Sequence, residues 1–306
     1  MPQSQVMTKT STASLDSIPE AKSVVAVRQP PRGHWVGDGF PVRTIFGYDN
    51  ARATSPFILM DYAGPLDFPA AETRRGVGEH PHRGFETVTI LYSGEVEHRD
   101  SSGGGGKIGP GDVQWMTAGS GLVHEEMHSW DYTRRGGPFE AIQLWVNLPA
   151  RLKMTPPKYQ TLTAERIPAV ALPDNAGTVR VIAGEFGGVK GPAETFTPMS
   201  LWDMRLNGGS GTLLTAPAGH NAAVFVLSGA IRVNGGTAAR DAELVVLDRK
   251  GEAFRVDAES DAKLLVLSGE PIDEPVFGYG PFVMNNEAEI RRAIADYQSG
   301  KMGHLR

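Results

Sequence analysis

Short apolar segments, separated by clusters of glycine, proline and aspartate, run through most of this 306-residue chain. From about Val24 onwards these segments are rich in Val, Ile, Phe and Tyr, which favour extended backbone. Thirty-seven glycines and 22 prolines supply the tight turns that many short strands need. The pattern therefore predicts an all-β fold made of sandwiches or barrels.

One strand-and-turn segment occurs twice. Residues 89–96, TILYSGEV, parallel residues 224–231, VFVLSGAI, at an offset of 135 residues. A proline-rich stretch from Pro149 to Tyr159 lies between the copies and is typical of a linker. We therefore expect a duplicated fold. Its expected parts are a disordered tail at 1–23, an N-terminal barrel at 24–150, a C-terminal barrel at 151–285 and a helix with a tail at 286–306.

The two ends of the chain differ in character. The first residues are polar, rich in Ser and Thr and without periodicity, which is typical of disorder. Near the C-terminus, Asn286 and Glu289 form a capping-box-like helix start, and Gly300 supplies a stop. Between them apolar residues recur at helical spacing and predict one amphipathic helix, about 287–299, that docks on a barrel. These residues are Ile290, Ala293, Ile294 and Tyr297.

Composition excludes several classes of protein. The absence of cysteine excludes disulfides, thiolate ligands and cysteine nucleophiles, so any metal must be held by nitrogen and oxygen. A net charge of −5 gives no electrostatic basis for binding nucleic acid or an anionic membrane. No apolar run approaches the roughly 20 residues of a membrane span, and the N-terminus lacks the apolar core of a secretory signal. We expect a cytoplasmic protein without nucleic-acid or membrane partners.

Four residues form the pattern that carries chemistry. His80 and His82 are two residues apart, as are His124 and Glu126, so each pair points to one face of an extended strand. Two facing strands of a small barrel could bring both pairs onto a single ion. Three imidazoles and a carboxylate suit a divalent first-row metal and leave coordination positions open.

The segments that carry these residues resemble the pirin family. The resemblance is densest at HPHRGFETV, residues 80–88, and at PGDVQWMTAGSGLVHEEM, residues 110–127, and it covers nearly all of residues 24–299. It implies a bicupin, in which two cupin barrels pack together, with one divalent metal ion in the N-terminal barrel. Fe(II) is the first candidate for that ion, and other divalent transition metals are alternatives. The resemblance also implies quercetin 2,3-dioxygenase activity, which some members of the family have.

The identity of the carboxylate ligand stays open at this point. The common cupin pattern His-x-His-x3-Glu selects Glu86, which strand alternation also predicts to face inward with the histidines. The pirin pattern selects Glu126, which we prefer, with Glu86 as a nearby charge partner. Of the other histidines, we expect His98 to be a hairpin or core residue. His128 shares the alternation of His124 and Glu126, so it could support the metal ligands, but we prefer a place at the surface.

The second barrel is expected to bind no metal. At the offset of 135 residues, Thr215, Pro217 and Asn221 lie opposite His80, His82 and Glu86, and no histidine lies near the position that matches His124.

The resemblance implies an enzyme that uses O2 and a small aromatic substrate, a flavonol such as quercetin. Glu126 would take the proton of the flavonol 3-hydroxyl as a general base, and the metal would stabilise the resulting oxyanion. Addition of oxygen then gives a depside and carbon monoxide. The alternative is a metal- or redox-sensing regulatory protein that binds a protein partner without turnover. The sequence contains no Lys/Arg-rich nuclear signal, so it gives that alternative no support.

Overall fold

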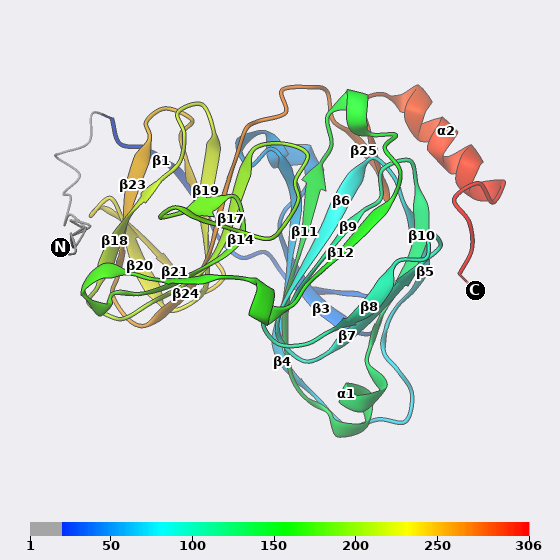
Figure 1. Ribbon diagram of the computed structural model, residues 1–306, viewed down its shortest axis with the longest axis horizontal. Coiled ribbons are helices and arrows are strands. Elements are labelled where there is room, and N and C mark those ends of the chain that lie inside the picture. The colour runs from blue at the N-terminus through cyan, green and yellow to red at the C-terminus, as the bar shows by residue number, and fades with distance from the viewer. Residues whose placement is uncertain (1–19, 306) are drawn as a thin grey trace, which may run out of the picture.

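The computed structural model describes residues 20–305 and consists of two β-barrels that lie side by side (Figure 1). In each barrel a seven-stranded sheet faces a four-stranded sheet. The large sheet of the first barrel has the order β12 (Lys158–Leu162), β9 (Val113–Thr117), β6 (Phe85–Ser93), β11 (Gly137–Asn147), β4 (Phe57–Phe68), β3 (Phe40–Phe46) and β2 (His34–Val36). Its small sheet has the order β5 (Gly76–His82), β10 (Leu122–His128), β7 (Val96–Asp100) and β8 (Gly105–Ile108).

The second barrel repeats this arrangement strand for strand. Its large sheet has the order β1 (Val24–Arg28), β22 (Leu244–Leu247), β19 (Asn221–Ser228), β24 (Ala262–Gly269), β17 (Met199–Leu206), β14 (Gly177–Ala183) and β13 (Ala169–Ala171). Its small sheet has the order β18 (Gly211–Thr215), β23 (Ala253–Ala258), β20 (Ala230–Val233) and β21 (Thr237–Arg240). The repeated sequence segments begin in β6 and β19, which hold equivalent places. The all-β bicupin expected from the sequence is confirmed.

Smaller elements connect and cover the barrels. Two hairpins pair β15 (Glu185–Phe186) with β16 (Val189–Lys190) and β25 (Phe277–Tyr279) with β26 (Phe282–Met284). The helices are α1 (Trp130–Arg135) and α2 (Glu287–Gln298), with short 3-10 turns at η2 (Tyr48–Ala53), η3 (Ala150–Leu152), η4 (Ala164–Arg166) and η5 (Pro173–Asn175). Within the described residues, neither α1 nor α2 has the length and hydrophobicity of a transmembrane helix.

Two edge strands do not follow the boundaries expected at residues 24 and 150. β1 precedes the first barrel in sequence but pairs with β22 of the second, and β12 follows residue 150 but pairs with β9 of the first. Each strand protects the equivalent edge of its large sheet. Strand propensity does not show which sheet edge a segment covers. The boundaries expected from the sequence therefore assigned β1 and β12 to the wrong barrels.

The expected tail at 1–23 also needs correction at its end. Lys22 is fully buried, and its ammonium donates to the carbonyls of His220, Asp248 and Arg249 at 3.0–3.3 Å. Three carbonyl acceptors match the three donors of a lysine ammonium, which offsets the cost of burying the charge. The remainder of the expected tail, residues 1–19, lies outside the described residues.

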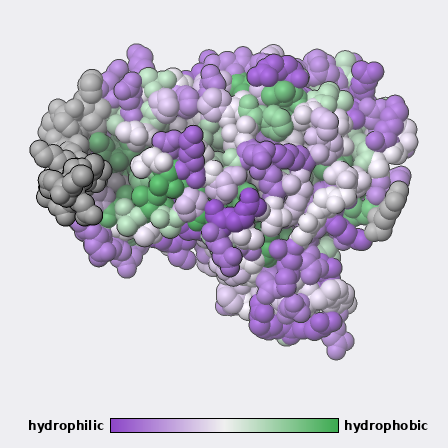
Figure 2. Space-filling model, in the orientation of Figure 1, coloured by the Kyte–Doolittle hydropathy of each residue, from purple (hydrophilic) through white to green (hydrophobic). Residues whose placement is uncertain are grey.

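The main core lies between the barrels, where the two large sheets pack face to face. It joins side chains of both, including Val88, Ile142 and Leu144 from the first barrel and Phe225 and Leu265 from the second. Burial at this interface removes more apolar surface from water than either sheet could alone. The outer face seen in Figure 2 is largely hydrophilic, with hydrophobic residues in scattered patches.

Helix α2 packs at the outer end of the first barrel, away from the second (Figure 1). The Asn286 side chain accepts from the Glu289 backbone N–H at 3.0 Å, as expected for its N-cap. Ile290 and Ala293 are buried against Val123 of β10, together with Phe282 and Met284. Tyr297, expected in the docked stripe, is instead 39% exposed because it lies at the edge of the contact near the helix end.

Candidate metal centre

Strand register brings the three histidines of the sequence motif together. In the pairing of β5 with β10, His80 lies opposite His124 and His82 lies opposite Leu122. One nitrogen from each of the three rings lies within 4.8 Å of the others. Two ligands that each bind one ion at about 2.1 Å are separated by about 3–4 Å, so small ring rotations would let all three share an ion.

Hydrogen bonding leaves one nitrogen of each ring for a ligand. Nδ1 of His80 faces the Gly78 carbonyl oxygen at 2.8 Å, and Nδ1 of His82 faces the Pro281 carbonyl oxygen at 3.2 Å. Because a carbonyl only accepts, Nδ1 carries the proton in both rings and Nε2 keeps its lone pair. Nε2 of His124 is buried without any hydrogen-bond partner, which fits a lone pair that binds a metal ion.

Burial keeps two of these rings neutral. It lowers the pKa of His82 and of His124 well below the usual value, and the neighbouring His80 lowers each further. A ring must be neutral to donate a lone pair to a metal, so the site is prepared for binding at neutral pH. The donor set of three imidazole nitrogens suits a divalent transition metal.

Glu126 lines the same cavity as His80, but it is not among the residues whose ligand atoms cluster within 4.8 Å of one another. A bulge in β5 places Val77 opposite Glu126, so Val77 and His80 both face the cavity that Glu126 lines. The Glu126 residue is 3% exposed. Its Oε1 accepts from Gln114 Nε2 at 2.5 Å and from Thr89 Oγ1 at 3.2 Å, and its Oε2 accepts from Gln143 Nε2 at 2.7 Å. These three hydrogen bonds fix the orientation of the carboxylate and leave one lone pair free, on Oε2.

The cavity between His80 and Glu126 is small. Its volume is about 40 Å³, and its walls combine the polar side chains of Thr89 and Gln143 with apolar ones such as Phe40 and Val42. Such a space holds a few water-sized molecules. Pockets for drug-sized ligands are about 300–1,000 Å³. The cavity as it stands therefore accommodates O2 or water, and a larger ligand requires its apolar wall to move.

Glu86, the alternative carboxylate, lies on the other side of the large sheet. Val88 and Ile90, which share its alternation on β6, pack into the core between the barrels, whereas Thr89 points to Glu126. The expectation that Glu86 faces inward with the histidines fails because β5 ends at His82 and a new strand begins at Phe85. Burial raises the pKa of Glu86 to about 7, while Thr117 Oγ1 donates to its Oε1 at 2.7 Å.

Two further histidines have surroundings that the sequence did not indicate. His98 of β7 is buried with its Nδ1 3.2 Å from Nδ1 of His124, so it is more than a hairpin residue. The sequence signal that could have indicated this role is the spacing of His98 and Asp100, which puts both side chains on one face of a strand. His128, expected at the surface, is 2% exposed because it packs among Phe40, Phe68 and Phe139.

The equivalent place in the second barrel has no such group. Its corresponding strands β18 and β23 contain no histidine. Side chains that include Leu214, Ile231, Phe254 and Val256 fill the interior with an apolar core. Among the described residues, His80, His82 and His124 form the one cluster that could hold a metal ion.

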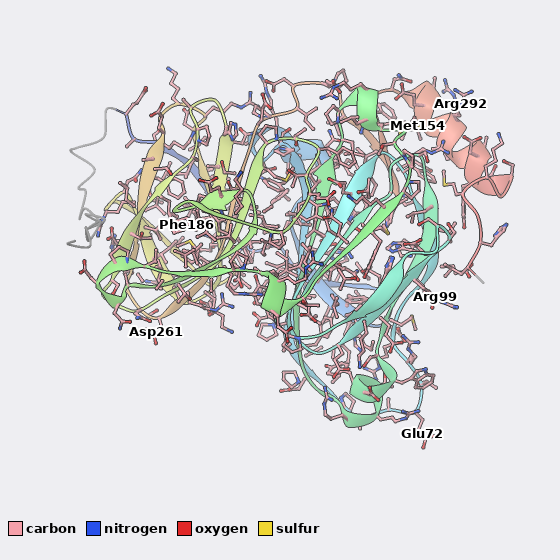
Figure 3. The ribbon with its side chains drawn as sticks, viewed as in Figure 1. Glu72, Arg99, Met154, Phe186, Asp261 and Arg292 are labelled. Atoms are coloured by element: carbon pink, nitrogen blue, oxygen red, sulfur yellow. The ribbon has the colours of Figure 1, made fainter. Side chains whose placement is uncertain are left out.

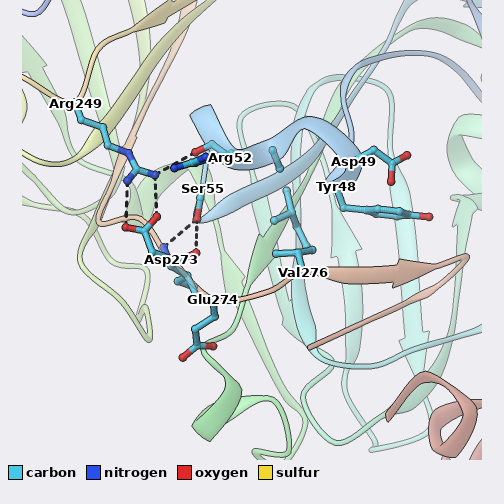
Figure 4. Close-up of a pocket in the computed structure, with 11 residues that line it drawn as sticks. Tyr48, Asp49, Arg52, Ser55, Arg249, Asp273, Glu274 and Val276 are labelled. Atoms are coloured by element: carbon cyan, nitrogen blue, oxygen red, sulfur yellow. Dashed lines mark hydrogen bonds and ion pairs between the residues drawn. The ribbon is translucent and has the colours of Figure 1, made fainter. Parts of the chain in front are cut away.

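A larger cavity than the one at Glu126 lies elsewhere. It has a volume of about 560 Å³ and lies between η2 and the segment around Asp273, at the junction of the barrels (Figure 4). The Arg249 guanidinium already donates to both carboxylate oxygens of Asp273, at 3.0 and 3.1 Å. No histidine lines this cavity, so it offers none of the chemistry of the metal centre.

Comparisons with known proteins agree with this architecture. The family model "Pirin" matches residues 39–146, and the model "Pirin C-terminal cupin domain" matches residues 201–303. A Pseudomonas aeruginosa protein with the provisional name quercetin 2,3-dioxygenase is 55% identical over 281 residues, which cover 92% of this chain and 98% of that protein.

Solved structures show the same fold. The crystal structure of quercetin 2,3-dioxygenase from Acinetobacter baumannii superimposes with a TM-score of 0.91 at 51% identity, covering 94% of this chain and 100% of that one. A bacterial pirin from Escherichia coli in complex with nickel(II) has a TM-score of 0.61 at 21% identity, covering 80% and 99% of the two chains. Both domain models, the long alignments and the shared bicupin fold lead to one conclusion: this chain belongs to the pirin family.

Proposed function

We propose that this protein is a metal-dependent dioxygenase of the pirin type that acts on quercetin or a related flavonol. The observation that carries the proposal is the buried, unpartnered Nε2 of His124 beside His80 and His82, next to a cavity that Glu126 also lines. His80, His82, His124 and Glu126 are the proposed ligands of one divalent ion, with Fe(II) as the first candidate. The bound ion would supply Lewis-acid stabilisation of an oxyanion and open positions for ligands.

The proposed catalytic residue is Glu126, as a general base. Gln114, Gln143 and Thr89 direct its carboxylate by hydrogen bonds, and the lone pair left on Oε2 can accept the flavonol 3-hydroxyl proton. The apolar wall formed by Phe40, Val42 and Val77 would exclude water from the deprotonated substrate. Because the cavity is about 40 Å³, we expect this wall to shift when a flavonol binds.

The test is a titration in two stages. Purified protein loaded with Fe(II) is first titrated with quercetin without oxygen, and the flavonol absorption band should shift as the 3-hydroxyl loses its proton. Oxygen is then admitted, and the band should disappear with release of carbon monoxide. Loaded protein that leaves the quercetin spectrum unchanged in both stages would refute the proposal and would favour the regulatory alternative. Cytoplasmic location remains a prediction.

A further inference from the structure

We propose that His98 and Asp100 are positioning residues that fix which nitrogen of His124 carries the proton, and thereby present Nε2 to the metal. This inference rests on the proposed metal centre. Both residues are buried, and both occupy the inward face of β7, where Asp100 lies opposite His124 and His98 opposite Glu126. Arg99, between them, points outward from the barrel and pairs with Glu125 (Figure 3).

The three side chains form a hydrogen-bonded chain that leads away from the metal site. Nδ1 of His124 lies 3.2 Å from Nδ1 of His98, and Nε2 of His98 lies 3.1 Å from Oδ2 of Asp100. The other carboxylate oxygen, Oδ1, accepts from the backbone N–H of Ser102 at 2.8 Å and of Gly104 at 3.0 Å, and from Ser102 Oγ at 2.5 Å. Those donors fix the orientation of the carboxylate.

Each proton along the chain follows from the one before it. An ionised carboxylate only accepts, so Nε2 of His98 carries a proton and donates to Asp100. In neutral His98, Nδ1 is then the acceptor, and Nδ1 of His124 must donate to it. His124 therefore keeps the lone pair of Nε2, the buried atom without a partner. A carboxylate behind a metal-bound histidine commonly fixes tautomer and orientation in this way, and here a second histidine transmits the effect.

His124 needs this chain more than the other two ligands do. His80 and His82 place Nδ1 against backbone carbonyls, which can only accept. His124 faces another imidazole, which can accept or donate, so its tautomer depends on Asp100. The His98 ring is itself held in place, because it stacks on Tyr159 with centroids 4.9 Å apart and an interplanar angle of 11°.

Asp100→Asn tests the inference because it reverses the chain while preserving shape. Three donors hold the amide oxygen at the position of Oδ1, so the amide NH2 faces His98. His98 must then accept at Nε2 and donate from Nδ1, which moves the proton of His124 to Nε2. We expect affinity for Co(II), measured by competition with a chelator, to fall about 10–100-fold. Asp112→Asn, which alters a turn carboxylate bonded to Gly109 and Ala164, is the matched control and should bind Co(II) as the unaltered protein does.

Nitrogen NMR of the histidine rings in the metal-free protein provides a readout that a purely structural role would not change. The unaltered protein should show His124 protonated at Nδ1, and Asp100→Asn should show it protonated at Nε2. A second variant, His98→Phe, keeps the ring on Tyr159 but removes the acceptor, and it should also weaken Co(II) binding. If Asp100→Asn retains both the tautomer and the affinity, the positioning role is wrong. If the unaltered protein binds no Co(II), the metal centre itself is wrong.

Discussion

Glu86 and Glu126 show how two carboxylates of one motif are separated by their surroundings. Three side-chain donors surround Glu126, whereas Glu86 has one donor to Oε1 and a buried Oε2 without a partner. Burial raises the pKa of Glu86 from 4.5 to about 7. An ionised Glu86 is therefore a source of instability in the core between the barrels.

The pH dependence of stability should reveal this cost. The unfolded chain releases the Glu86 proton near pH 4.5 and the folded chain near pH 7, so the folded state binds more protons in between. The contribution of Glu86 to stability should fall as pH rises through that window, by up to about 3 kcal/mol. Glu86→Gln should remove this fall in denaturant unfolding measured from pH 4.5 to 8, while one metal ion per chain is retained. An unchanged pH dependence, or loss of the metal, would argue against our placement of Glu86.

Glu126→Gln, unlike Glu86→Gln, should abolish most of the turnover of quercetin. It removes the proposed base and keeps the three histidines. General bases contribute about 100–10,000-fold to rate, so we expect turnover of quercetin to fall at least about 100-fold. Glu125→Gln is the matched control: its carboxylate pairs with the outward-pointing Arg99, and turnover should be unaffected. Equal rates in Glu126→Gln and the unaltered protein would remove Glu126 from the mechanism.

At this scale, alternation within one strand was the dependable part of the sequence prediction. It correctly placed His80 with His82, and the pairing of β5 with β10 added His124. It failed for Glu86 because alternation is not preserved across Arg83 and Gly84, where one strand ends and another begins. The partners of His98 could not be predicted because they depend on the pairing of β7 with β10, a contact between strands distant in sequence.

At the scale of elements, helix α2 and the segment before it pack on the outside of β5 and β10, the strands that carry the three histidines. Val123, which precedes His124, packs with Ile290, and the Pro281 carbonyl accepts from His82. Arg83 donates to Asp296 of the helix at 3.0 Å. The C-terminal elements, remote in sequence from the motif, thus contact both histidine strands.

Truncation at Asn285 should therefore lower both stability and metal affinity. Loss of the buried Ile290 and Met302 alone removes on the order of 3–6 kcal/mol of apolar burial. Urea unfolding and Co(II) titration measure the two effects. A point-variant comparison supports the interpretation: Ile290→Ala should destabilise by about 2–5 kcal/mol, and Tyr297→Ala, at an exposed site, by much less. A truncated chain that unfolds like the intact one would show that α2 contributes no packing.

Most of the strands were predictable, but their partners were not. The segment of β1 was recognisable as extended, whereas β12 begins inside the stretch from Pro149 to Tyr159 that was expected to be a linker. The helix prediction was within one residue of α2. The sheets that β1 and β12 join depend on which edge is left uncovered when both barrels have formed. That information is spread over the whole chain and is absent from either segment.

At the scale of the whole molecule, the two barrels share a topology but differ in what fills them. Polar side chains, including Thr89, Gln114, Glu126 and His124, line part of the interior of the first barrel. The second interior is an apolar core around residues such as Phe254. Duplication was predictable from one repeated segment, and the absence of a metal site from the second barrel stays a prediction that rests on its missing histidines.

The central claim is that one divalent metal ion binds to each chain, at the three histidines of the first barrel. Elemental analysis after loading with Fe(II) without oxygen, repeated on His124→Ala, tests it most directly. We predict one ion per chain in the unaltered protein and loss of that ion in the variant. Two tightly held ions per chain, or one ion retained by His124→Ala, would contradict this account of the site.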